Sequence, residues 1–357
     1  MHALALASLG AATSQDADRE DARIADAFAA MIAAVDGDAL ALAFDSAPSA
    51  AVYRHLWRSL ARVEDAPRAA GLSARIFALP LTLIVGSEER RDAPVELPGV
   101  LDEAAALTAM LRGHGALGGN QAFTLAPTLV AADALAMKRI PILLRWGAFP
   151  RTHEAPAAPH DLPPAPMQAH GGDARVYLRF LVGAALAAPG ADLYVDGTVG
   201  AWGMPAARWL AQGLAIAGTT VLALPHAPSN LVVALQRGRG AQREVSAQLF
   251  ASNAIRRFRA ATGEPSAVIS AHYSAESETG GELRLSLSSV FDPADAEGFR
   301  CPLYAADHVG EVVEMLVTLM RDCRVNDVQV LPGVHADRDD ATGAPLLFKP
   351  GALPELH

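Results

Sequence analysis

The feature of the sequence that most constrains the fold is a proline-rich stretch near the middle of the chain. Residues 150–172 read PRTHEAPAAPHDLPPAPMQAHGG, with six prolines and no hydrophobic period. Proline lacks a backbone N–H and favours extended polyproline geometry, which interrupts both helices and sheet ladders. We therefore predict a linker over 150–172 that separates a domain at 1–149 from a second domain at 173–357. The length of 357 residues fits two domains of about 150 residues each.

The N-terminal part of the chain combines helical periodicity with short apolar runs. Apolar residues recur at helical spacing over 21–35, 49–63 and 101–112, which predicts three amphipathic helices. A compact run of branched residues at 75–86 predicts a strand, and a shorter apolar run at 39–44 predicts another. We expect a helix-rich α/β domain.

The C-terminal part alternates strands and helices more clearly. Strands are expected at 176–186, 219–224, 267–273, 282–289 and 327–331. Helices are expected at 205–216, 243–260 and 308–324. From Thr219 onward the order is β-α-β-β-α-β, which is the order of the ferredoxin-like split βαβ motif. The predicted fold class is therefore α+β (mixed α/β), with a ferredoxin-like C-terminal domain after the helix-rich one.

Seven segments of the chain follow one another in an order that carries a family resemblance. They are ALPLTLIVGS, HGALGGNQAFTLAPTLVAADAL, WLAQG, LPHAPSNLVVALQRG, REVSAQLFASNAIRRFR, PSAVISAHYS and ELRLSLSS. In apolar pattern and segment order the chain resembles an uncharacterised betaproteobacterial protein family of unknown function. The resemblance implies the two-part layout. It implies no activity, because the family has none to carry over.

The charge of the chain argues against nucleic acid as a partner. The chain has 29 Lys and Arg residues against 39 Asp and Glu, a formal net charge of −10. Proteins that bind DNA or RNA usually present a basic surface to the phosphates. An acidic chain lacks that electrostatic signature.

The apolar runs and the cysteines indicate where the protein resides. No run approaches the roughly 20 apolar residues that cross a bilayer, and the run at 3–12 lacks the basic start of a signal peptide. Cys301 and Cys323 form neither a disulfide framework nor a metal-binding spacing. We expect reduced thiols, a cytoplasmic location and no membrane association.

Two histidines at predicted strand ends are the candidate catalytic residues. His226 follows the strand at 219–224, His272 ends the strand at 267–273, and Glu276 lies in the loop beyond it. If folding brought these side chains together, they could perform acid–base chemistry on a small molecule. The simpler interpretation is that they are separate polar residues at strand ends. The chain has no G-x-S-x-G elbow for a nucleophilic serine. Because it also lacks a phosphate-binding loop, we predict no cofactor.

A C-terminal segment contains the residue types of a divalent-cation site. His335 is followed closely by Asp337, Asp339 and Asp340, and imidazole and carboxylate groups are ligands of such ions. The same segment has the composition of a solvated acidic loop, and further ligands would have to converge from elsewhere in the fold. We predict no metal site.

Six arginines stand out in this otherwise acidic chain. They are Arg237, Arg239, Arg243, Arg256, Arg257 and Arg259. A charge run of this kind is either a solvated helix face or a surface that binds anions. We predict that these arginines bind an acidic partner protein or another anion.

The leading hypothesis is therefore a non-catalytic interaction or assembly subunit, which acts with a protein partner or as a homo-oligomer. Ferredoxin-like sheets often serve as binding modules, an analogy at the level of fold only. The alternative is a small-molecule enzyme that uses a His/carboxylate pocket formed by His226, His272 and Glu276. Whether these side chains line one pocket discriminates between the two hypotheses.

Overall fold

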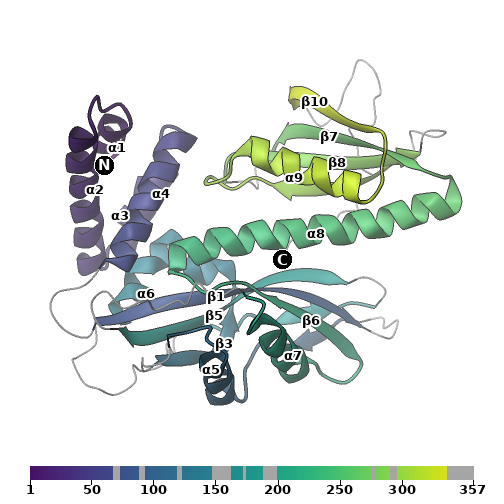
Figure 1. The fold of residues 1–357 in the computed structure, drawn as a ribbon, viewed down its shortest axis with the longest axis horizontal. Helices are drawn as coiled ribbons and strands as arrows, with labels where there is room; N and C mark the ends of the chain where they lie inside the picture. Colours follow the sequence, from purple (N-terminus) through teal and green to yellow (C-terminus); the bar gives the residue numbers. More distant parts are fainter. Residues whose placement is uncertain are drawn as a thin grey trace. The chain divides into compact units, whose positions relative to one another are not determined.

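The computed structural model describes residues 1–66, 73–87, 93–118, 123–146, 162–171, 174–187, 199–274, 278–289 and 296–335. The chain forms two compact units, Met1–Arg239 (unit 1) and Gly240–His357 (unit 2), and Figure 1 shows the elements of each. The predicted linker does not coincide with this division. Its described part, 162–171, belongs to unit 1, where buried Met167 and Ala169 join the core.

Unit 1 begins with a group of helices. They are α1 (His2–Leu9), α2 (Ser14–Ala34), α3 (Gly37–Asp45), α4 (Ala50–Asp65) and, later in the chain, α6 (Ile140–Trp146). Side-chain oxygens of Thr13, Asp36 and Ser49 accept backbone N–H groups at the starts of α2, α3 and α4, which satisfies donors that a helix leaves open at its N-terminus.

The predicted strand at 39–44 is wrong, because these residues belong to helix α3. The Asp36 side chain accepts the backbone N–H of Ala39 at 2.9 Å, and alanine, which is frequent in this segment, has the highest helix propensity. Leu40 and Phe44 are buried while Leu42 is 65% exposed. The short apolar run at 39–44 therefore suggested a strand, although these residues form a helix with a side-chain cap at its N-terminus.

A four-stranded antiparallel sheet forms the centre of unit 1. Its order is β3 (Phe123–Val130), β5 (Arg175–Ala187), β1 (Ser73–Ser87) and β6 (Thr219–Pro225). Two short strands, β2 (Val95–Leu97) and β4 (Met167–Ala169), pair beside it. Turns of 3-10 helix lie at η1 (Ala132–Leu135) and η2 (Met137–Arg139). The predicted strands at 75–86, 176–186 and 219–224 are confirmed.

Alternate residues of the unit 1 sheet supply two apolar cores. Phe77, Leu79 and Leu81 of β1 pack with helices α5 (Ala104–Gly113) and α7 (Gly203–Leu214). Ile76 and Ala78 pack with residues of α2, α4 and α6 on the opposite face. This arrangement follows from the two-residue period of a strand, which sends successive side chains to opposite faces.

Helix α8 (Leu231–Ala261) starts in unit 1, earlier than the predicted start at 243. Asn230 fixes the start, because its Oδ1 accepts the Val233 N–H at 2.9 Å and its Nδ2 donates to Asp65 Oδ2 at 2.8 Å. A Cβ at Gly238 would lie 2.8 Å from Leu178 Cδ1. Glycine therefore lets the helix approach β5 closely.

Unit 2 is a four-stranded sheet with helices on one face. It contains β7 (Pro265–Tyr273), β8 (Gly281–Ser289), β9 (Ala296–Pro302), α9 (Val309–Asp322) and β10 (Val328–His335). The strand order is β10-β7-β8-β9, with β10 parallel to β7 and the other pairs antiparallel. Leucines of β8 pack against apolar residues of α8 and α9, including Phe258 and Leu316.

The structure has the α+β class that the sequence predicts, but unit 2 does not follow the predicted β-α-β-β-α-β order. Strand β6, which was expected to begin that motif, pairs with β1 in unit 1. Strand β9 at 296–302 was not predicted, and it pairs with β8 as the third strand of an antiparallel meander. Its sequence, AEGFRCP, mixes Gly, Arg and Pro and lacks a strand-like alternation.

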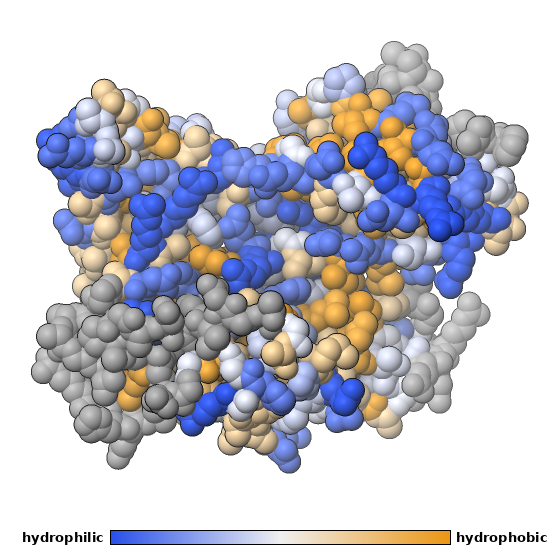
Figure 2. Space-filling view, viewed as in Figure 1, coloured by the Kyte–Doolittle hydropathy of each residue, from blue (hydrophilic) through white to orange (hydrophobic). Residues whose placement is uncertain are grey.

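No helix in the described ranges has the length and apolar content that crossing a bilayer requires. Hydrophilic side chains cover much of the described surface on the face shown in Figure 2, with hydrophobic groups between them.

Candidate functional site

The six predicted arginines fall in both units and differ in exposure. Arg237 is exposed in unit 1, where its Nη1 donates to the Ala227 carbonyl at 2.9 Å, and Arg239 is half-buried. Arg243 is only 7% exposed in unit 2. Only the three that lie farther along α8 combine exposure with close spacing.

Arg243 holds unit 2 together and is not part of an open surface. Its guanidinium forms a salt bridge with Asp307 and donates to the Pro302 carbonyl at 3.2 Å. Asp307 also accepts the Tyr304 N–H at 2.8 Å. The Asp307 carboxylate therefore links the connection after β9 to α8 and does not cap the following helix.

Arg256, Arg257 and Arg259 form what we call the arginine surface, near the end of α8. Arg257 pairs with Glu297 of β9. Arg259 donates from Nε to Glu264 Oε1 at 2.8 Å, and the bound carboxylate raises the pKa of the Arg259 guanidinium. The Arg257 and Arg259 side chains are 55% and 38% exposed, so solvent reaches both ion pairs.

Arg256 differs from its two neighbours in its partners. Its Nη2 donates to Asn253 Oδ1 at 3.3 Å, and it forms no ion pair with any residue that the structure describes. The residue is exposed. Arg256 is therefore a solvated cation of unit 2 whose charge no described carboxylate neutralises.

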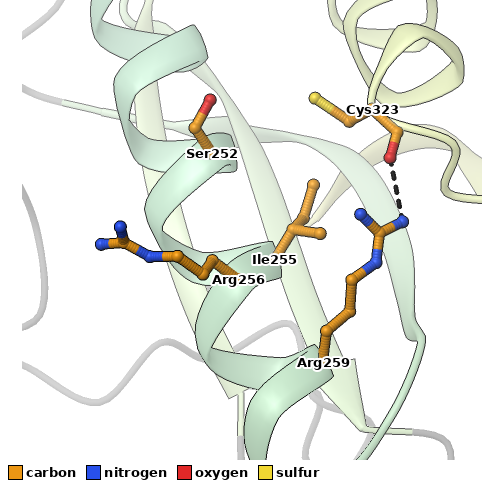
Figure 3. Close-up of a pocket in the computed structure, with 5 residues that line it drawn as sticks. All are labelled: Ser252, Ile255, Arg256, Arg259 and Cys323. Atoms are coloured by element: carbon orange, nitrogen blue, oxygen red, sulfur yellow. Dashed lines mark hydrogen bonds between the residues drawn. The ribbon is translucent and has the colours of Figure 1, made fainter.

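A cavity of about 320 Å³ adjoins the arginine surface. It is lined by Ser252, Ile255, Arg256, Arg259 and Cys323. In Figure 3 the Arg259 side chain reaches toward the Cys323 carbonyl, which accepts its Nη2 at 3.1 Å, while Arg256 extends away from Cys323. The opening therefore has an apolar floor at Ile255 and guanidinium groups at its rim.

The two cysteines have the environment of packed thiols. Burial raises the pKa of the Cys301 thiol to about 12, although the charge of Arg243 opposes the shift. The pKa of Cys323 is raised as well, first by burial and then by the nearby Asp322 carboxylate. Because the thiolate is the reactive form, neither side chain is activated as a nucleophile.

The structure places the candidate histidines in different units. His226 directly follows β6 in unit 1, and its Nε2 lies 3.0 Å from Thr82 Oγ1. Burial, followed by the charge of Arg237, lowers its pKa. His272 belongs to unit 2, and Glu276 lies outside the described residues.

His272 lies within a group of polar side chains on one side of the unit 2 sheet, which we call the polar sheet face. Its described members include Ser270, His272, Glu282, Arg284, Ser286, Arg300 and His335, at positions that alternate with the apolar core residues. His272 is 1% exposed, and its Nε2 lies 2.7 Å from Ser270 Oγ. Its cross-strand partner is Glu282.

The second histidine of this group comes from the segment that was considered for metal binding. His335 pairs in register with His272 through the parallel β10–β7 ladder, and the ring centroids are 6.0 Å apart. Asp337, Asp339 and Asp340 lie outside the described residues. Within the described ranges, no three His, Cys, Asp or Glu side chains are grouped to hold a metal ion.

Sequence reasoning missed Glu282, Arg284 and Arg300 as members of a site. The alternation in GELRLSLSS marks Glu282 and Arg284 as sharing one face of a strand. The alternation does not indicate that this face is buried. Arg300 could not be assigned to the face because it belongs to β9, a strand that was not predicted.

Comparisons with protein-family models, curated proteins and solved structures gave no match to this chain.

Proposed function

We propose that this chain is a non-catalytic interaction subunit that binds an acidic segment of a partner protein through the arginine surface. The observation that carries the proposal is Arg256, an exposed guanidinium that no described carboxylate neutralises. Guanidinium groups bind carboxylates through paired N–H donors. A carboxylate of the partner is therefore the group that Arg256 would bind.

The two neighbouring arginines extend the surface, although both have intramolecular partners. The Arg257–Glu297 and Arg259–Glu264 pairs are open to solvent, and exposed ion pairs contribute little to stability because water and salt screen them. A partner with several carboxylates could exchange with Glu264 or Glu297 at small cost. Arg256 and Arg259, which line one cavity, would then present two guanidinium groups to the partner, while Arg257 projects from another side of α8 toward Glu297.

The adjoining cavity favours a protein segment over a free ion as the ligand. Its volume of about 320 Å³ is at the lower end of the range of about 300–1,000 Å³ that small-ligand pockets occupy. Ile255 offers apolar contact and Ser252 a hydroxyl. An acidic side chain with its aliphatic stem fits this combination of lining groups.

The negative charge of the whole chain would make binding of an acidic partner selective for the arginine surface. With a net charge of −10, most of the molecule repels an acidic partner, so a local cationic surface restricts the orientation in which the partner can approach. A second copy of this acidic chain is one such partner. Sedimentation of the wild-type chain at low and high salt would reveal self-association.

Charge reversal at Arg256 tests the proposal. We expect Arg256→Glu to weaken binding of a fluorescent oligoglutamate peptide by about tenfold at low salt, because attraction becomes repulsion. The difference from wild type should shrink as salt rises. Fluorescence anisotropy of the peptide with the intact chain measures both effects.

The matched control is Arg58→Glu, which makes the same charge change at an exposed position of α4 in unit 1. Peptide binding should remain close to that of wild type in this variant. Equal binding by the Arg256→Glu variant, or no binding by wild type at low salt, would refute the arginine surface as the binding site.

The enzyme alternative has one observation in its favour. The 2.7 Å contact between Ser270 Oγ and His272 Nε2 is the geometry of a hydroxyl next to a base. Both residues are only 1% exposed, so a substrate could not reach them in this conformation. We therefore place the interaction function first.

A further inference from the structure

Helix α9 ends in a backbone conformation that glycine usually adopts. Arg324 has a φ of 61°, in the left-handed region that brings the Cβ of an L-residue too close to the following carbonyl oxygen. Its N–H donates to the Arg321 carbonyl at 2.8 Å, and the Val325 N–H donates to the Met320 carbonyl at 3.0 Å. These two hydrogen bonds form the Schellman motif, in which glycine is the usual residue at the position of Arg324. An arginine there carries a conformational cost.

The Arg324 side chain contributes no charge interaction to unit 2 that would offset this cost. The residue is exposed, and it forms no ion pair or side-chain hydrogen bond with the residues that the structure describes, the nearby Asp322 included. The apolar contact that accompanies the motif comes from Val325 and Met320, which are 3% and 0% exposed. The Arg324 guanidinium is therefore available to a carboxylate of another molecule.

Arg324 lies next to the cavity that adjoins the arginine surface. The preceding residue, Cys323, lines that cavity, and its carbonyl accepts Nη2 of Arg259 at 3.1 Å (Figure 3). This hydrogen bond joins the end of α9 to α8 within unit 2. Arg256 and Arg259 bring two guanidinium groups to the cavity from α8, and Arg324 adds a third one residue beyond its Cys323 wall.

We propose that Arg324 is a third binding residue for the acidic partner and donates to one of its carboxylates beside Cys323. This role rests on the function proposed above, and it places a binding contact on α9 as well as on α8. A guanidinium group binds a carboxylate through paired N–H donors. The partner segment must then carry at least two carboxylates, spaced so that one meets Arg256 while another meets Arg324.

The strained backbone favours a binding role for Arg324 over a structural one. Residues in sparsely populated backbone conformations cluster at functional sites, where the side chain is needed despite its cost to stability. If Arg324 served only to end α9, glycine would do so without strain. Glycine at this position should therefore preserve or raise stability while it weakens binding.

Arg324→Gly tests this role through two measurements on the intact chain. We expect its thermal midpoint to equal or exceed that of wild type, because glycine adopts the left-handed conformation without strain. We expect its binding of the fluorescent oligoglutamate peptide at low salt to weaken about threefold, as for the loss of one solvent-exposed ion pair. Arg324→Lys keeps the positive charge, so it should bind the peptide more tightly than the glycine variant.

Val35→Gly is the matched control for the backbone change, because Val35 ends α2 in unit 1 with a φ of 55°. Its peptide binding should equal that of wild type. Wild-type affinity in Arg324→Gly, equal weakening in the glycine and lysine variants, or a marked fall in the thermal midpoint of Arg324→Gly would overturn the role of Arg324 and leave the proposed function standing. If wild type binds no peptide, both are overturned.

Discussion

His226 illustrates how burial decides the role of a single ionisable residue in this chain. The sequence suggested it as a base, yet its ring is half-buried and contacts the Thr82 hydroxyl. Burial and, to a lesser degree, the charge of Arg237 lower its pKa. The folded state of unit 1 therefore favours the neutral ring, which serves the packing of β6 beside β1.

The lowered pKa of His226 predicts a specific dependence of stability on pH. Below its ordinary pKa of about 6.5 the unfolded chain binds a proton that the folded chain does not, so stability falls as the pH drops toward the folded value. His226→Gln keeps a polar group near Thr82 but does not titrate. We expect wild type to lose more unfolding free energy between neutral and mildly acidic pH than the variant.

Urea unfolding at several pH values measures this difference. Above the ordinary pKa of histidine, the difference in unfolding free energy between wild type and the His226→Gln variant should not depend on pH. An equal loss of stability in both proteins on acidification would show that His226 does not carry the effect.

At the scale of elements, the salt bridge between Arg243 and Asp307 fastens α8 to the segment between β9 and α9. The two side chains are 9% and 10% exposed. Removing one member of a buried pair leaves an unpaired charge and typically costs about 3–5 kcal/mol. We expect Arg243→Met to destabilise unit 2 by roughly that amount, as measured by urea unfolding.

The matched control for this prediction is Arg259→Met, because Arg259 also pairs with a carboxylate, that of Glu264, but at an exposed site. Solvent screens that pair, so the loss of stability should be much smaller. Equal destabilisation by the two variants would contradict a structural role that is specific to Arg243.

Elements with strong local signals could be predicted from the sequence, and those that depend on tertiary contacts could not. The predicted strands at 267–273 and 282–289 match β7 and β8, because their apolar alternation reflects one buried face. The early start of α8 depends on Asn230 and on the close approach of Gly238 to β5. Neither contact can be read from local composition.

The candidate sites were predictable to a similar extent. His272 and His335 were singled out for separate reasons, acid–base chemistry and metal binding, and the parallel β10–β7 ladder brings them to one face. Arg243 was grouped with the exposed arginines because sequence spacing does not reveal burial. The residue types therefore indicated which side chains could belong to a site. Which side chains meet depends on strand pairing and burial, which the local sequence does not show.

At the scale of the whole molecule, the division of the chain depends on pairing between distant strands. Strand β1 pairs along its length with β5, although the proline-rich stretch at 150–172 separates them in sequence. Strand β6 then joins the same sheet beside β1. Local composition suggested a boundary at that stretch, but the long-range pairing keeps both sides of it in unit 1, and the division falls within α8.

The central claim is that the end of α8 carries the binding surface for an acidic partner. Helix ends open locally more readily than helix centres, and a bound partner opposes that opening. Hydrogen–deuterium exchange of the intact chain, with and without oligoglutamate peptide, tests the claim most directly. We predict slower exchange over 252–259 in wild type and much less slowing in the Arg256→Glu variant at the same peptide concentration. Unchanged exchange over 252–259 while the peptide is bound to wild type would contradict the claim.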